Sequence, residues 1–176
     1  FNGIVLSGLG SIWWGVIGVL YFKSVSFVSP LELTVHRTIW TAFLLVVSIS
    51  IFSNWNDIFK ILKNLKKILL LIFTSILIVT NWFTWIYAVT VNKLIDASFG
   101  YFIFPILSVF FGILFLNEGH NKMKLIAISL VIVSVTYLLI DLKEAPWIGL
   151  IVALTWSSYT LIRKKIKIPA DHGLFI

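Results

Sequence analysis

The sequence predicts an all-α integral membrane protein, a bundle of hydrophobic helices, and three observations point to this fold class. First, 60% of the 176 residues are apolar and only 12% are charged, whereas a soluble domain usually carries about 25% charged residues. Second, the apolar residues form runs of roughly 20, the length that crosses the hydrocarbon core of a bilayer. Third, the basic residues gather in alternate connections between these runs, as in multi-pass membrane proteins.

Six segments reach the length of a membrane span, about 17 to 25 residues. The last two are the shortest, and apolar runs near the lower limit are also compatible with a tilted or buried segment. The six predicted spans are residues 3–22, 31–52, 68–91, 97–116, 123–140 and 147–162.

The distribution of basic residues predicts the orientation of these spans. Of the 14 basic residues, only Lys23, Arg37, Lys93 and Lys143 lie outside the connections that follow the second, fourth and sixth spans. Lys and Arg collect in cytoplasmic loops, so these three connections and the N-terminus are predicted to be cytoplasmic, in a plasma-membrane protein. The basic segment 163–167 is interpreted as a topology anchor rather than a site for anionic lipid or nucleic acid, and no nucleic-acid partner is expected.

Several kinds of site are excluded by the residue types present. The chain has no cysteine and three scattered histidines, so we expect no disulfide framework, no metal site and no cofactor. A membrane-embedded enzyme would need a nucleophile, an acid–base pair or a metal cluster at membrane depth. Only Glu32 and His36 approach such a set, and they have no third partner, so no enzymatic activity is predicted.

A polar stripe runs along the third predicted span. At 100° per residue, Thr74, Asn81, Trp85, Ala88 and Asn92 fall within one narrow arc of that helix. An amide facing lipid would be costly, so the midspan Asn81 is expected either to bond to another helix or to line a wet cavity. The sequence leaves both roles open.

Tryptophan is placed unusually in this chain. Trp55 and Trp147 lie at span ends, where tryptophan normally marks the membrane interface. Four others lie near the middles of their spans, where they either pack between helices or line a cavity for aromatic, apolar or cationic solutes. The four midspan tryptophans are Trp13, Trp14, Trp82 and Trp85.

The fourth span is interrupted by Gly100 and Pro105. Asp96 just before it suits a helix N-cap, with direct ion binding as the alternative. Pro105 has no N–H for the carbonyl of Tyr101, so a kink is predicted at Gly100 and Pro105. Bent helices at membrane depth often line transport sites. Together with the polar stripe, this predicts a solute pathway lined by Trp14, Asn81, Trp82, Trp85, Tyr101, Phe102 and Pro105.

The densest ionisable cluster lies at the outer end of the second span and consists of Glu32, His36 and Arg37. Glu32 and His36 are four residues apart on one helical face, so they can pair or pass a proton, whereas Arg37 projects elsewhere. Histidine titrates near an unperturbed pKa of about 6.5. The cluster is therefore a candidate for gating or proton coupling, and a purely interfacial role is the alternative.

Several segments also resemble known motifs. The run HRTIWT at 36–41 is similar to HRxxWS, and LNE at 116–118 and YTLIRKK at 159–165 are similar to LGE and YGLLRKK. Two longer segments, NWFTWIYAV at 81–89 and ASFGYFIFPILSV at 97–109, resemble NWxxxxWAV and ASLGYFINPLLSV. These motifs, in this order, are those of RarD-like proteins in the EamA branch of the drug/metabolite transporter superfamily. Phe104 stands where that family often has Asn, and Asn117 where it often has Gly.

The resemblance implies ten helices arranged as two inverted five-helix repeats around a central cavity, with alternating access. Residues 1–142 would form the first repeat, 143–176 would begin the second, and four further helices are expected outside this chain. The implied function is secondary transport, by default export, of a small-molecule solute across the lipid bilayer, with the proton as a candidate coupling ion. A channel or a non-transporting structural membrane subunit is the alternative.

Overall fold

The computed structural model describes residues 2–117, 119, 122–141 and 146–176, and all regular elements in these ranges are helices. The predicted all-α class is thus confirmed. In chain order the elements are α1 (Asn2–Ile12), the π-helix η1 (Trp13–Gly18), α2 (Val19–Ser24), α3 (Pro30–Phe52), α4 (Trp55–Leu62), α5 (Leu65–Thr90), α6 (Leu94–Leu116), α7 (Lys122–Asp141), α8 (Trp147–Ile166) and α9 (Ala170–Phe175).

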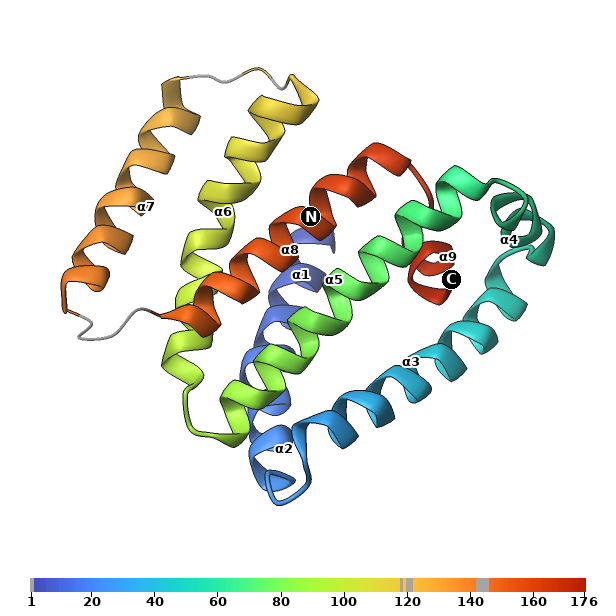
Figure 1. The fold of residues 1–176 in the computed structure, drawn as a ribbon, viewed down its shortest axis with the longest axis horizontal. Helices are drawn as coiled ribbons and strands as arrows, with labels where there is room; N and C mark the ends of the chain where they lie inside the picture. Colours follow the sequence, from blue (N-terminus) through green and yellow to red (C-terminus); the bar gives the residue numbers. More distant parts are fainter. Residues whose placement is uncertain (1, 118, 120–121, 142–145) are drawn as a thin grey trace.

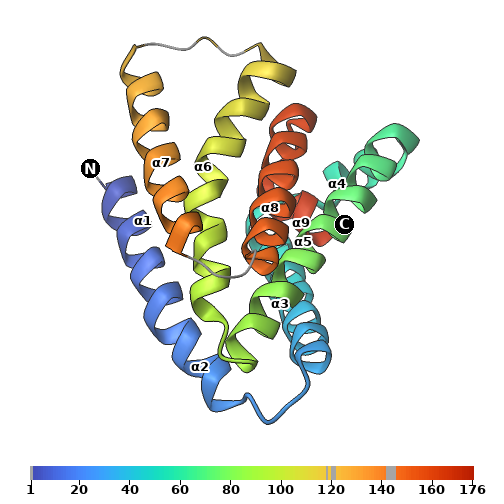
Figure 2. The same cartoon turned by 60° about the vertical axis from the view of Figure 1, so that its left-hand side comes forward.

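The centre of the bundle is formed by α8, which packs between α5 and α6 (Figure 1). Helix α3 lies along α5, α7 packs on the outer side of α6, and the short α9 packs against α3 (Figure 1). Figure 2 shows α1 running along one side of the bundle, with α2 reaching the turn that joins α5 to α6. The chain is therefore a helical bundle with its closest packing around α8.

Four helices in the described part of the chain are long and apolar enough to cross a membrane: Gly3–Ser24, Pro30–Phe52, Leu65–Thr90 and Leu94–Leu116. They correspond to the first four predicted spans. The fifth and sixth predicted spans are also helical, but α7 has only a shorter apolar stretch and α8 carries three basic residues in its last turn. Membrane crossing by α7 and α8 therefore stays a prediction.

Many large apolar side chains on the outside of the bundle are exposed, among them Ile4 (82%), Ile39 (57%) and Phe52 (82%). Contiguous apolar surface of this extent is not stable in water, and lipid is the solvent that suits it. This agrees with a multi-pass membrane protein.

Local signals set the helix starts. Ser29 caps α3, where its Oγ accepts a hydrogen bond of 3.2 Å from the backbone N–H of Glu32, and Pro30 occupies the first turn. Asn54 and Asn64 cap α4 and α5 in the same way. Helix α4 was not predicted, because its eight residues are too few for a membrane span.

The prediction that Asp96 caps α6 is wrong. The turn after α5 is closed by Asn92, in the left-handed region at φ 57°, and by a 2.7 Å hydrogen bond from the N–H of Lys93 to the carbonyl of Ala88. Helix α6 consequently begins at Leu94, and Asp96 lies inside its first turn.

Helices α6 and α8 cross at a pair of glycines. A Cβ placed on Gly100 would lie 2.5 Å from the backbone oxygen of Gly149, and one on Gly149 would lie 2.5 Å from the backbone oxygen of Asp96. Only glycine permits this approach of two backbones. Gly100 thus has a packing role, and α6 remains helical through Pro105, so the predicted kink stays a prediction.

Helix α6 ends at Asn117, which takes the left-handed conformation at φ 52°. Helix C-caps adopt this conformation with Gly or, less often, Asn. Asn117, which stands at the Gly position of the LGE motif, therefore still adopts the left-handed backbone conformation of a helix C-cap. The following Glu118 and the connection residue Lys143 lie outside the described residues.

Candidate functional site

The centre of the bundle contains a cavity of about 300 Å³, which we call the middle cavity. Its walls come from η1, α3, α5, α6 and α8, so five separate elements converge on it. Five of the seven predicted pathway residues line it, and the predicted gating residue Arg37 lines it too. The complete lining is Trp14, Arg37, Asn81, Trp82, Trp85, Tyr101, Phe104 and Trp156.

Arg37 is the charged residue of this cavity. Its guanidinium carbon lies over the ring of Trp14, 4.6 Å from the ring centroid, and over the ring of Trp82, at 4.2 Å. Cation–π contacts of this kind are worth about 0.5 to 2 kcal/mol each, with the larger values in desolvated places. The two midspan tryptophans thus hold a cation in the cavity wall.

Asn81 joins α5 to α8. Its side chain is buried, and its Nδ2 donates hydrogen bonds to the backbone oxygen of Val152 at 3.0 Å and to Thr155 Oγ1 at 3.1 Å. Of the two roles that the sequence leaves open for Asn81, the structure therefore shows the bond to another helix. The same residue also lines the middle cavity, so the two roles coexist.

Trp85 belongs mainly to an aromatic cluster that adjoins the cavity. Its ring centroid is 5.0 Å from that of Trp14 and 5.5 Å from that of Phe22. The side chain is only 4% exposed and packs in a core that includes the fully buried Ile86 and Ile148. Trp85 thus supports the cavity wall as well as forming part of it.

Phe102 and Pro105 do not line the middle cavity, although they were predicted to line a pathway. Both are exposed, whereas Tyr101 and Phe104, three residues apart on α6, line the cavity. Successive helical residues point about 100° apart, so neighbours in one motif face different surroundings.

Two cavity residues were missed by sequence reasoning. Trp156 lies in the middle of α8, and its midspan position is the same signal that identified Trp82 and Trp85. Phe104 is the departure from the family pattern, and it faces Trp156 with a centroid distance of 6.5 Å. These two residues make the α6–α8 side of the cavity aromatic.

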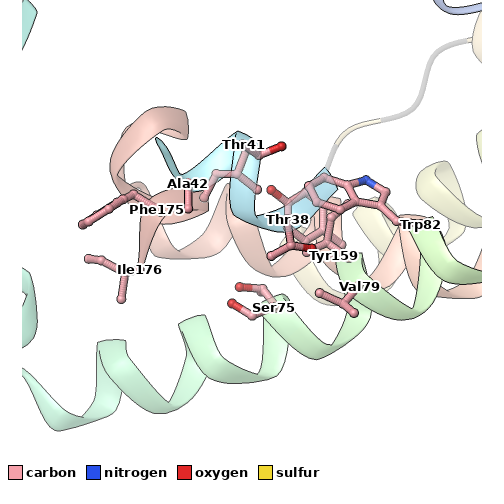
Figure 3. A pocket seen from close by; sticks show the side chains of 13 residues that line it. Thr38, Thr41, Ala42, Ser75, Val79, Trp82, Tyr159, Phe175 and Ile176 are labelled. Atoms are coloured by element: carbon pink, nitrogen blue, oxygen red, sulfur yellow. The ribbon is translucent and has the colours of Figure 1, made fainter. Parts of the chain in front are cut away.

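A second cavity of about 200 Å³, which we call the α9 cavity, lies between α3, α5, α8 and α9. Figure 3 shows Trp82 at one end of it and Phe175 and Ile176 at the other, with Thr38 and Thr41 from α3 facing Ser75 from α5. Since Trp82 also lines the middle cavity, this side chain separates the two spaces.

A groove of about 480 Å³, which we call the α3 groove, lies beside the first turns of α3 and is lined by Glu32, His36, Arg37 and Thr41 among others. Arg37 is shared with the middle cavity and Thr41 with the α9 cavity. The three hollow regions therefore adjoin one another at α3, and each pair has a lining residue in common.

Glu32 and His36 share a face of α3, as their spacing predicts. Glu32 Oε1 lies 4.0 Å from His36 Nε2, and the side chains of Glu32 and His36 are 61% and 63% exposed. This is a loose and open pair, in contrast to Arg37, which points into the middle cavity. All three residues of the predicted cluster line the α3 groove, and Arg37 also lines the middle cavity.

Helix α9 closes the other end of the α9 cavity. Arg163 Nη2 donates hydrogen bonds to the backbone oxygens of Ile168 and Pro169, and Ser53 Oγ donates to Asp171 Oδ2 at 3.1 Å. The hydrogen bond from His172 holds the pKa of Asp171 below its usual value. In the described parts of the chain, no group of three or more His, Cys, Asp or Glu could hold a metal ion.

Comparison with known proteins agrees with the motifs. A family model described as the EamA-like transporter family matches residues 1–140. Protein RarD of Escherichia coli is 34% identical over 175 residues, which cover 99% of this chain and 59% of that protein. No solved structure matches this chain.

Two further relatives carry the name of uncharacterized transporters. One from Vibrio cholerae is 35% identical over 99% of this chain and 58% of its own length. YojE of Bacillus subtilis is 34% identical over 98% of this chain and 59% of its own length. The chain thus spans less than two thirds of the length of these relatives.

The family is one of transporters rather than enzymes, in agreement with the absence of a predicted catalytic set. The match extends over the first five predicted spans and the relatives over almost the whole chain. On these grounds, the resemblance read from the motifs is confirmed, and the chain belongs to the EamA-like transporter family.

Proposed function

We propose that this protein is part of a secondary transporter that exports small organic solutes across the plasma membrane, and that the solute passes through the middle cavity. The observation that carries this proposal is that the α3 groove, the middle cavity and the α9 cavity adjoin one another. The α3 groove shares Arg37 with the middle cavity and Thr41 with the α9 cavity, and the two cavities share Trp82. A solute could therefore pass from one space to the next by movement of these side chains.

The proposed mechanism is alternating access between two inverted repeats, with residues 1–142 as the first and 143–176 as the start of the second. The middle cavity suits a binding site, because it is concave, mostly aromatic and carries a few polar groups. The relatives named as transporters support the same function.

The test is solute movement in proteoliposomes that contain the full-length protein. We expect saturable, gradient-driven movement, and we expect Asn81→Ala and Trp82→Ala to reduce its rate about tenfold, the effect of losing roughly 1.4 kcal/mol of binding. Leu69→Ala and Ile132→Ala are the matched controls, because those side chains are 59% and 46% exposed on the outside of the bundle. Equal effects at all four positions, at equal protein amounts, would leave packing as the better explanation. Movement that rises linearly with solute concentration would favour a channel.

The proposed orientation has the N-terminus in the cytoplasm and can be tested with single cysteines, since the native chain has none. In right-side-out cells, Lys63→Cys and Lys164→Cys should be shielded from an impermeant thiol reagent, whereas Lys23→Cys and Lys143→Cys should react. Lys63, Lys164 and Lys23 are exposed, so burial would not prevent labelling at these positions. The reverse labelling pattern would overturn the orientation.

We further propose that Glu32 and His36 couple protonation to transport at the outer end of the pathway. Both side chains line the α3 groove, so they are open to water at its mouth. If the pair acts as a unit, His36→Gln or Glu32→Gln should flatten the pH profile of transport, and the double variant should add little, because coupled residues are not additive. Profiles of unchanged shape in all three variants would reduce the pair to an interfacial role.

A further inference from the structure

The guanidinium of Arg37 is the starting point, because it lacks a partner that its chemistry requires. Its Nη1 is buried and makes no hydrogen bond to any described residue. The rings of Trp14 and Trp82 attract the positive charge through their faces, but they offer no acceptor oxygen to an N–H group. A buried donor without an acceptor is unfavourable, and more so when it carries charge.

The surroundings of Arg37 in the middle cavity do not supply the missing acceptor. The lining contributed by the described residues contains no carboxylate, and its uncharged acceptors, Asn81 Oδ1 and Tyr101 Oη, make no hydrogen bond to Nη1. Glu32, the acidic residue of the α3 groove, is directed toward His36 on another face of α3. The charge of Arg37 is thus held between two indoles and faces an aromatic space.

The remaining walls define what else a ligand must carry. Tyr101, Phe104 and Trp156 surround the space beside Arg37 with aromatic rings. A volume of about 300 Å³ lies at the lower end of the range for ligand pockets. A small flat or apolar group fits these walls, and a planar anionic group matches the fork of N–H donors of arginine.

We propose that the middle cavity binds small organic carboxylates with a ring or a comparable apolar body, and that Arg37 binds the carboxylate. This inference rests on the proposed function and names its class of solute. The carboxylate would accept hydrogen bonds from the guanidinium and neutralise its charge, and the aromatic walls would hold the apolar body. Arg37 would therefore determine specificity by charge, whereas Trp14 and Trp82 would position its guanidinium.

The experiment measures binding to the full-length protein in nanodiscs, by quenching of tryptophan fluorescence and by calorimetry. The probes are phenylacetate, its neutral isostere phenylacetamide and the cation phenethylamine. We expect phenylacetate to bind at least about tenfold more tightly than phenylacetamide, the difference expected for a hydrogen bond to a charged group. Phenethylamine should bind most weakly, since Arg37 repels it.

Arg37→Gln should remove this preference, so that phenylacetate and phenylacetamide bind within about twofold of each other, and Arg37→Lys should retain part of it. Arg163→Gln is the matched control, because Arg163 is the other arginine of the chain and binds backbone oxygens near α9, outside the cavity. It should leave the preference unchanged. All variants are checked for thermal stability, so that loss of folding is not read as loss of binding.

Three results would overturn the inference: equal binding of phenylacetate and phenylacetamide to the unmodified protein, tighter binding of phenethylamine, or no saturable binding of phenylacetate. Binding does not require transport, so the two proposals fail separately. Arg37-dependent binding without gradient-driven movement in proteoliposomes would refute the proposed function alone. Movement of neutral or cationic solutes that is insensitive to Arg37→Gln would refute this inference alone.

Discussion

Replacing Gly100 by alanine should destabilise the protein by about 1 to 3 kcal/mol, the usual cost of overpacking, and leucine at this position should cost more. The new Cβ would lie 2.5 Å from the backbone oxygen of Gly149 and 3.0 Å from Cβ of Val152. A backbone oxygen cannot rotate away as a side chain does, so α6 and α8 must move apart. Their separation would also disturb the Asn81 bonds to α8 and the α6–α8 side of the middle cavity. The measurement is the melting temperature of the purified protein in mild detergent.

The matched controls for this substitution are Gly8→Ala and Gly10→Ala in α1. A Cβ at either position meets nothing within 4 Å, and alanine is the better helix former by about 1 kcal/mol. These variants should melt at the same temperature as the parent protein or slightly above it. A Gly100→Ala protein that melts together with them would show that the helices cross less closely than described.

Truncating Trp85 to alanine should destabilise the protein by about 3 to 5 kcal/mol, the cost of removing a large side chain from a well-packed core. The ring is 4% exposed and contacts the rings of Trp14 and Phe22. Its loss would leave a cavity beneath Trp14 and so release one of the two indoles that hold Arg37. Chemical or thermal unfolding in detergent measures the effect, and Trp85→Phe, which keeps an aromatic ring, should lose less.

Trp13→Ala is the control for Trp85→Ala, because Trp13 is the same residue type at a comparable depth in its span but is 64% exposed. Its truncation should change the free energy of unfolding by less than about 1 kcal/mol. Similar losses for the two variants would mean that Trp85 is not the centre of a packed cluster.

Much of this fold could be predicted from the sequence, because a membrane span is defined by length and apolarity, both of which can be read directly. The third span illustrates this: it was predicted at 68–91 and is helical over Leu65–Thr90. Helices α4 and α9 were not predicted, since each is shorter than a span and is held by contacts distant in sequence. The ring of Trp55 in α4, for example, packs against Phe175 in α9.

The residues of the candidate site were only partly predictable. Midspan position predicted that Trp14 and Trp82 line a solute pathway; both line the middle cavity, and a role in solute passage stays a prediction. Midspan position alone could not distinguish Trp14 from the exposed Trp13 beside it. That difference depends on which way the π-helix η1 turns each ring, and a helix period read from sequence does not contain it. Arg37 was assigned to the outer cluster by its neighbours in sequence and lines the α3 groove with them, but its side chain also lines the middle cavity.

At the crossing of α6 and α8, backbone touches backbone, and no flexible side chain lies between Gly100 and Gly149 to adjust if one helix slides along the other. The two helices are thus mechanically coupled, and the wall formed by Phe104 and Trp156 has a stiff support. The facing wall is supplied by η1 and α3, which lie outside this crossing. Any widening of the cavity would therefore be a movement of η1 and α3 relative to the α6–α8 pair, rather than a separation of α6 from α8.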